Sequence, residues 1–144
     1  LAHSLAPVPL EGDGLMHGLA GLAASTSRIP GVNCRFVCDS PVLIEDATVA
    51  THLYRIAQEA VTNALKHGQA AKLDLTLTRL AGGVELRVKN NGHPLPAASG
   101  ARAGMGLRVM RYRAELIGAR LTIKSDKTKG VRVTCTLRLP VRAA

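Results

Sequence analysis

Aromatic side chains are scarce in this chain, and their scarcity limits both the core and the ligands it can hold. Only 2% of the 144 residues are aromatic, and Trp is absent. Proteins that bind single-stranded nucleic acid stack the bases on aromatic rings, so that mode of recognition is disfavoured here. Because 47% of the residues are nevertheless hydrophobic, aliphatic side chains are numerous enough for the core of one domain, and disorder of the whole chain is excluded.

Cysteines and long apolar runs are also few. Cys34, Cys38 and Cys135 form an odd set without CxxC spacing, so a zinc site is not expected. Cys34 and Cys38 would share one face of a strand, so their thiols could lie near each other. We nevertheless expect reduced cysteines in the core of a cytosolic domain. The uncharged stretch 14–27 is too short to span a bilayer, and no signal-peptide pattern is present.

Acidic residues are outnumbered, and the imbalance lies in one half of the chain. The sequence has 10 acidic and 19 basic residues, for a net charge of +9. Residues 1–72 contain 5 basic and 6 acidic residues, whereas residues 73–144 contain 14 basic and 4 acidic ones. A basic half predicts an anionic partner, but charge alone leaves phosphates, nucleic acid and other anions open.

The spacing of hydrophobic residues predicts three helices and five strands, with strands between the helices and after the last one. The helical segments are 15–24, 46–67 and 107–117, and the strand-like segments are 32–38, 73–78, 84–88, 121–123 and 131–139. Helices combined with an antiparallel run indicate an α+β fold, a two-layer α/β sandwich with helices on one face of the sheet. Residues 1–9, with two prolines, predict a linker, and residues 10–144 predict the domain.

A polar stripe runs along the longest predicted helix. Arg55, Glu59, Asn63 and Lys66 follow at steps of four, four and three residues, with His67 beside them. Most such stripes are solvated faces, but Asn is a poor helix former among the surrounding alanines. A carboxylate and an amide oxygen one turn apart suit Mg²⁺, which takes few protein ligands and completes its shell with water and phosphates. Both interpretations stay open at this point.

Two glycine-containing motifs bound a predicted loop at 90–105, which is rich in Gly, Pro, Ala and Ser. Residues 90–92 read NNG, a pattern that usually marks only a turn. Residues 104–107 read GMGL where the loop is expected to enter a helix, and they indicate either a flexible hinge or a phosphate site at a helix N-terminus. Long loops of this kind often act as lids over a ligand.

The order of these motifs resembles the ATP-binding catalytic domain of sensor histidine kinases, within the ATPase superfamily that includes gyrase, the Hsp90 chaperone and MutL. Residues 53–67 read LYRIAQEAVTNALKH and are similar to the family's N box. Residues 104–114 read GMGLRVMRYRA and resemble its G2 box, and GVRV at 130–133 resembles its final glycine turn and strand. The similarity points to the nitrate/nitrite-sensor-like subgroup and implies a Bergerat-type fold with a mixed, mostly antiparallel sheet.

The resemblance assigns roles to individual residues around ATP and Mg²⁺. Asn63 would ligate Mg²⁺ between the phosphates, and Glu59 would orient water on the metal or act as a base. Asn90 and Gly92 would sit at the adenine, and residues 93–105 would form the ATP lid. The full set that the resemblance places at the nucleotide is Asn63, Lys66, His67, Asn90, Gly92, Gly104, Met105, Gly106 and Leu107.

The adenine pocket departs from the family pattern at two positions. Asn90 stands where the family usually has Asp, and Pro94 stands where a second glycine is expected. A neutral amide makes a weaker hydrogen bond than a carboxylate, so the substitution predicts weaker ATP binding. A degenerate interaction scaffold is therefore an alternative to an active kinase domain, and a basic nucleic-acid-binding module is a less favoured one.

The phospho-accepting histidine of such kinases lies on a separate dimerisation helix. His3 lies in the predicted linker and His17 on a helix of the ATP-binding domain, so neither fits that role. The resemblance implies that the domain works with its own dimerisation segment and a response regulator, in a homodimeric parent protein. A cytoplasmic domain with no direct contact with nucleic acid or membrane is expected, whether or not the parent protein is membrane-anchored.

The basic surplus is concentrated after residue 101. Residues 102–144 contain 11 basic and 2 acidic residues. We expect Arg102 and Arg108 to face the phosphates of ATP. One nucleotide cannot contact the remaining cations, which are expected to be solvated or to form a docking surface for the partner segment.

Overall fold

The computed structural model describes residues 10–94, 101–126, 128 and 130–138. The elements in chain order are α1 (Gly14–Ser27), β1 (Asn33–Val37), α2 (Ala47–Lys66), β2 (Lys72–Leu80), β3 (Gly83–Asn90), α3 (Ala101–Leu116), β4 (Arg120–Asp126) and β5 (Gly130–Arg138). Every helix and strand expected from the sequence is present among them. The predicted linker 1–9 and residue 139 of the last predicted strand lie outside the described residues.

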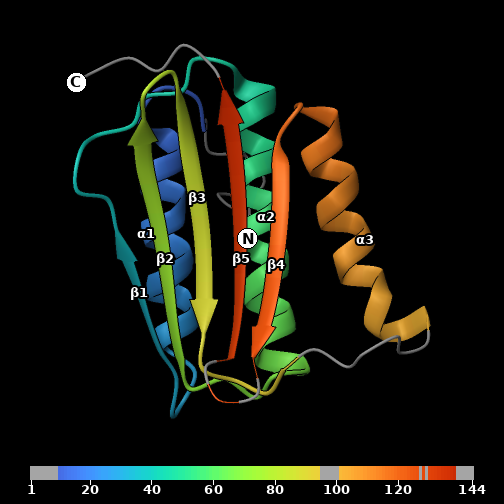
Figure 1. Ribbon diagram of the computed structural model, residues 1–144. Helices are drawn as coiled ribbons and strands as arrows, with labels where there is room; N and C mark the ends of the chain where they lie inside the picture. The colour runs from blue at the N-terminus through green and yellow to red at the C-terminus, as the bar shows by residue number, and fades with distance from the viewer. Residues whose placement is uncertain (1–9, 95–100, 127, 129, 139–144) are drawn as a thin grey trace, which may run out of the picture.

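The strands form one mixed sheet with the order β1-β2-β3-β5-β4. β1 and β2 are parallel and are joined through α2, whereas the other three neighbouring pairs are antiparallel. Figure 1 shows the helices behind the sheet, with α2 between α1 and α3. The predicted two-layer α+β sandwich, with a mostly antiparallel sheet, is therefore confirmed. None of the described helices has the length and apolar character needed to cross a bilayer.

Helix α2 begins and ends where the sequence predicts. The side-chain Oδ1 of Asp46 caps its start by accepting hydrogen bonds from the N–H groups of Thr48 (2.9 Å) and Val49 (3.2 Å). Its end is marked by His67, whose N–H donates to the carbonyl of Asn63. Small side chains make up much of its buried face, so the helix can lie close to the sheet. The buried residues are Ala50, Leu53, Ile56, Ala57, Ala60, Val61 and Ala64.

Buried and outward-facing side chains alternate along each central strand of the sheet. In β3, Val84, Leu86 and Val88 are buried against the helices, whereas the residues between them point to the outer face. β5 follows the same pattern, which its pairing with β3 carries across the sheet. Gly130 begins β5 with φ +88°, and a Cβ there would collide with the carbonyl oxygen of Asn90. Only glycine lets β5 start so close to the end of β3.

Helix α3 begins earlier than the sequence predicts. The loop was expected to continue to Met105, but Ala101 already starts the helix, so Gly104 and Gly106 lie within its first turns. Ala and Arg are strong helix formers, so the first turns tolerate two glycines that each cost about 1 kcal/mol relative to alanine. The predicted stop at Gly118 is confirmed, because this residue has φ +69° just after the helix.

The three cysteines are free thiols with different access to solvent. Cys135 is fully buried, and burial raises the pKa of its thiol to about 12. Burial, with a smaller contribution from the nearby Asp74 carboxylate, raises the pKa of Cys34 to about 11. Cys38 is only half-buried, and its thiol donates a hydrogen bond to the carbonyl of Ser40 at 3.2 Å.

These environments predict an order of alkylation. Burial and the nearby Asp39 carboxylate also raise the pKa of Cys38, but its thiol is the most accessible of the three. Because Cys34 and Cys135 are buried and have pKa values of about 11 and about 12, iodoacetamide should modify Cys38 first in the folded protein at pH 8. In guanidinium chloride all three should react at similar rates. A mass-spectrometric time course measures both rates. Equal labelling of Cys38 and Cys135 in the folded protein would contradict this packing.

Candidate nucleotide-binding site

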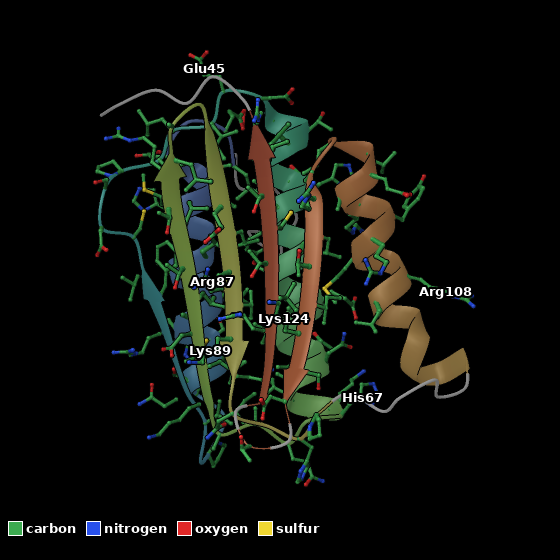
Figure 2. All side chains as sticks on the ribbon, in the orientation of Figure 1. Glu45, His67, Arg87, Lys89, Arg108 and Lys124 are labelled. Atoms are coloured by element: carbon green, nitrogen blue, oxygen red, sulfur yellow. The ribbon has the colours of Figure 1, made fainter. Side chains whose placement is uncertain are left out.

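A narrow pocket lies between α2, α3 and the sheet. Four of the residues that the sequence places around the nucleotide line it: Asn63, His67, Asn90 and Leu107. His67 lies at the C-terminal end of α2 (Figure 2). The remaining lining residues are Ala60, Ala64, Gly68, Val88, His93, Pro94, Met110, Val131 and Val133. The pocket is thus a mainly apolar slot with a few polar groups, which is typical of small-ligand sites.

Asn90 is the buried polar residue of this slot, with 6% of its surface exposed. Its Oδ1 accepts a hydrogen bond from the N–H of Gly92 at 2.7 Å. Because that N–H needs an acceptor, the orientation of the amide is fixed, and the NH₂ group is on its other side. Within the described part of the chain the NH₂ group has no hydrogen-bond partner, so it is available to a ligand.

The next residue, Asn91, has a structural role instead. Its Oδ1 accepts hydrogen bonds from the N–H groups of Ala71 (3.0 Å) and Lys72 (2.9 Å), and its own N–H donates to the carbonyl of Lys72 (3.1 Å). These contacts tie the end of β3 to the start of β2. The motif NNG therefore forms a bend, closed by the hydrogen bond from Gly92 to the Asn90 side chain, and it contributes one residue to the pocket lining.

Gly92 and His93 pass closely over the end of α2. A Cβ on Gly92 would lie 2.6 Å from the carbonyl oxygen of Gly68, which is too close for any other residue. The N–H of His93 donates to the same carbonyl at 2.7 Å. This contact holds His93 and Pro94 at the rim of the pocket.

Gly106 lies against the two polar side chains that the sequence associates with a metal. A Cβ at this position would lie 2.7 Å from Oδ1 of Asn63 and 2.7 Å from Oε2 of Glu59. Nδ2 of Asn63 lies 2.8 Å from the same point, so the ends of both side chains meet at the backbone of α3, and each offers an oxygen donor there. This donor set fits Mg²⁺, which prefers oxygen ligands and takes most of them from water and phosphates. The described residues contain no cluster of three or more His, Cys, Asp or Glu, so a ligand would have to supply the other donors.

The polar stripe of α2 does not stay on one side of the helix. Residues four apart are rotated by about 40° in an α-helix, so the stripe winds around it. Arg55 and Glu59 line a second groove between the helices, where Arg55 donates a hydrogen bond to Gln58 at 2.8 Å. Lys66 is exposed and is not among the described residues that line the pocket.

The orientation of Arg108 does not bring it to the pocket lined by Asn63 and Asn90. Arg108 is exposed and projects outward from α3 (Figure 2). The backbone of Gly104 and Met105 lies in the first turns of α3, and the side chains of residues 101–105, including Arg102, lie outside the described part of the structure.

Sequence reasoning missed the apolar lining of the pocket. Val88, Val131 and Val133 come from the inner faces of β3 and β5, and Met110 comes from α3. The period of two in the strands and the helical period of α3 would have placed them on the inner side. Nothing in the sequence showed that α2 leaves a pocket above them.

Comparisons with known proteins agree with this geometry. The family model described as histidine kinase-, DNA gyrase B-, and HSP90-like ATPase matches residues 48–141. The nitrate/nitrite sensor protein NarQ of Escherichia coli is 32% identical over 102 residues, which cover 70% of this chain and 18% of that protein. The sensor histidine kinase LiaS of Bacillus subtilis is 30% identical over 129 residues, which cover 90% of this chain and 35% of that protein. The chain thus spans about a fifth to a third of these relatives.

Solved structures show the same fold. The histidine kinase domain of the Erythrobacter litoralis blue-light activated histidine kinase superposes with a TM-score of 0.74 at 18% identity, over 95% of this chain and 67% of that chain. The ATP binding domain of PrrB from Mycobacterium tuberculosis superposes with a TM-score of 0.66 at 25% identity, over 88% of this chain and 93% of that chain.

The resemblance inferred from the motifs is therefore confirmed. The matched region, 48–141, contains α2, β2, β3, α3, β4 and β5, which are the elements that form the pocket and carry its polar residues. The chain belongs to the family of histidine kinase-, DNA gyrase B- and HSP90-like ATPases.

Proposed function

We propose that this domain binds ATP with Mg²⁺ and supplies the γ-phosphoryl group for phosphorylation of a histidine on a separate dimerisation segment of its parent protein. The phosphoryl group would pass from there to a response regulator, in two-component signalling. The parent protein would act as a homodimer, with this domain in the cytoplasm. The family membership and the sensor-kinase relatives support this proposal.

One observation carries the proposal. The Asn63 amide and the buried Asn90 amide line one mainly apolar pocket, and Gly106 lies against both Asn63 and Glu59. An apolar slot suits a purine ring, and a buried amide can hydrogen-bond its polar edge. Convergent oxygens suit a divalent cation that neutralises phosphate charge.

The proposed reaction is a phosphoryl transfer, which depends on positioning and charge neutralisation more than on covalent chemistry with the protein. The bond between the γ-phosphorus and its bridging oxygen breaks, ADP leaves, and a bond forms between phosphorus and a nitrogen of the acceptor imidazole. When bound, Mg²⁺ would neutralise charge on the phosphates, held by Asn63. Glu59 would orient water or accept a proton beside it.

The alternative of a weakly binding scaffold rests on a specific contact. Oδ1 of Asn90 already accepts the N–H of Gly92, and the neutral amide offers no charge to strengthen a bond with adenine. Such a domain would keep the fold and lose the catalytic step. Affinity for ATP separates the two proposals.

Titration calorimetry with ATP, with and without Mg²⁺, tests the proposal directly. We expect binding that strengthens with Mg²⁺, and Asn63→Ala should weaken it by about tenfold or more because a contact to a charged group is lost. Asn33→Ala, on the exposed edge of β1, is the control and should leave affinity unchanged. No binding at millimolar ATP would favour the scaffold, whereas duplex DNA binding with a steep salt dependence would favour a nucleic-acid module.

Asn90→Asp restores the acidic residue that the family usually has at this position, and so tests the proposed contact with adenine. A carboxylate would make a charge-assisted hydrogen bond with the amino group of adenine, so affinity for ATP should rise about five- to tenfold. Asn91→Asp is the matched control, because its oxygen keeps accepting the N–H groups of Ala71 and Lys72 outside the pocket. Unchanged ATP affinity in Asn90→Asp would show that this residue does not contact the base.

Gly106→Ala tests whether the close contact of Gly106 with Asn63 and Glu59 of α2 matters for nucleotide binding. The added methyl group would displace the side chains of Asn63 and Glu59, so nucleotide affinity should fall by about tenfold or more while the helix itself tolerates alanine. Gly21→Ala in α1 is the control, because no atom lies within 4 Å of its Cβ, and it should raise stability by about 0.5–1 kcal/mol. Calorimetry and thermal unfolding measure the two effects. A Gly106→Ala variant that binds ATP normally would contradict this geometry.

A further inference from the structure

A row of three cations crosses the outer face of the sheet, on the side away from the helices. Lys89 of β3 pairs with Arg132 of β5, and Arg132 pairs with Lys124 of β4. Figure 2 shows Lys89 and Lys124 on the face of the sheet turned to the viewer, with Arg87 further along β3. We call Lys89, Arg132 and Lys124 the cation row.

Acidic residues near the row are already bonded elsewhere. Asp74, the β2 partner of Lys89, accepts a hydrogen bond from Arg35 at 2.9 Å. Glu85 pairs with Arg87 at 3.2 Å, one step further from the row. Within the described residues, none of the three cations of the row has an acidic side chain within ion-pair distance.

This arrangement opposes folding. Directly opposite residues of neighbouring strands have Cβ atoms about 5 Å apart, and like charges at that distance are destabilising. In the next row Arg87 is flanked by Thr76 and Thr134, so this face also accommodates neutral side chains. Three adjacent cations are therefore not a requirement of the sheet, and their positive potential suits an anionic partner.

The cation row borders a shallow hollow of about 540 Å³ at the end of the sheet. Asp126 also lines the hollow, where its carboxylate accepts hydrogen bonds from the N–H and the hydroxyl of Thr128, both at 2.7 Å. Lys89 and Lys124 are exposed, and Arg132 is half-buried. The positive groups are therefore accessible from solvent.

The spacing of the row selects among anionic partners. Neighbouring strands lie about 4.8 Å apart, so the three cations are spaced at about 5 Å along a line of about 10 Å. Carboxylates at positions i, i+4 and i+8 of a helix are also about 5–6 Å apart along one face. We propose that the cation row docks an acidic helix of a partner polypeptide that carries three carboxylates at this spacing.

Two other classes of anionic partner fit less well. The described outer face carries no aromatic side chain, so it has no platform on which nucleic-acid bases could stack. No large apolar side chain lies within the row to insert into a lipid surface, and binding to vesicles would be electrostatic only. Charge complementarity with a regularly spaced acidic helix fits the row best.

The test uses two synthetic Ala-rich helical peptides of identical composition. One has Glu at i, i+4 and i+8, on one face, and the other has Glu at i, i+5 and i+10, spread around the helix. NMR titration of the protein at low ionic strength should show shifts in β3, β4 and β5, with about tenfold tighter binding of the first peptide. Equal affinities, or stronger effects of duplex DNA or anionic vesicles on the same amides, would overturn the proposal.

Protein variants separate the row from overall charge. Replacing Lys89, Lys124 and Arg132 together by Gln should weaken binding of the first peptide about tenfold. The control replaces three exposed cations elsewhere, Arg28, Arg79 and Arg111, by Gln and should change affinity less than about threefold. If both triple variants lost the same affinity for the peptide, net charge alone would explain the binding and the proposal would be overturned.

A stability measurement distinguishes docking from a structural role. Arg132→Thr removes the central charge and places a third outward threonine on β5 beside Thr134 and Thr136, so the melting temperature should rise by a few degrees while peptide affinity falls. A lower melting temperature with unchanged peptide affinity would show that Arg132 serves packing and would overturn the proposal.

Discussion

The contact of α2 with the alternating strands of the sheet is the constraint on which the rest of the structure depends. The buried face of α2 is rich in alanine, and the inner faces of β3 and β5 are rich in valine. These small and branched side chains bring helix and sheet together over most of their length. At the C-terminal end of the helix, Ala60, Ala64 and Gly68 leave the space that becomes the pocket. Site and core are thus built from one continuous packing surface.

The elements of this fold could be predicted from the sequence because their signals are local. The alanine period of α2 and the alternation of β2, β3 and β5 each act within a few residues. The start of α3 could not be placed, because two glycines hid the helical propensity of residues 101–103. Closely spaced glycines can mark a loop, but they can also mark a helix whose backbone packs closely against another element.

The candidate site was only partly predictable for the same reason. Asn63 stands out in the sequence as a poor helix former among alanines, and Asn90 stands out through the NNG motif; both line the pocket. Lys66 and Arg108 were grouped with them by spacing and resemblance, but the turn of each helix directs them elsewhere. The contact of Gly106 with Asn63 and Glu59 joins elements more than forty positions apart along the chain, and no local pattern reports it. Long-range proximity is what the fold adds to the motifs.

The strict alternation of β3 and β5 has a consequence for how this domain can change in length. Lys89 and Arg132 point outward, while their neighbours Asn90, Val131 and Val133 point to the pocket. Inserting or deleting one residue in either strand would exchange the two faces, turning a cation into the pocket and a valine to solvent. Both faces would be lost in a single event. Related domains should therefore vary in length at the connections between strands, and the central strands should keep a constant number of residues.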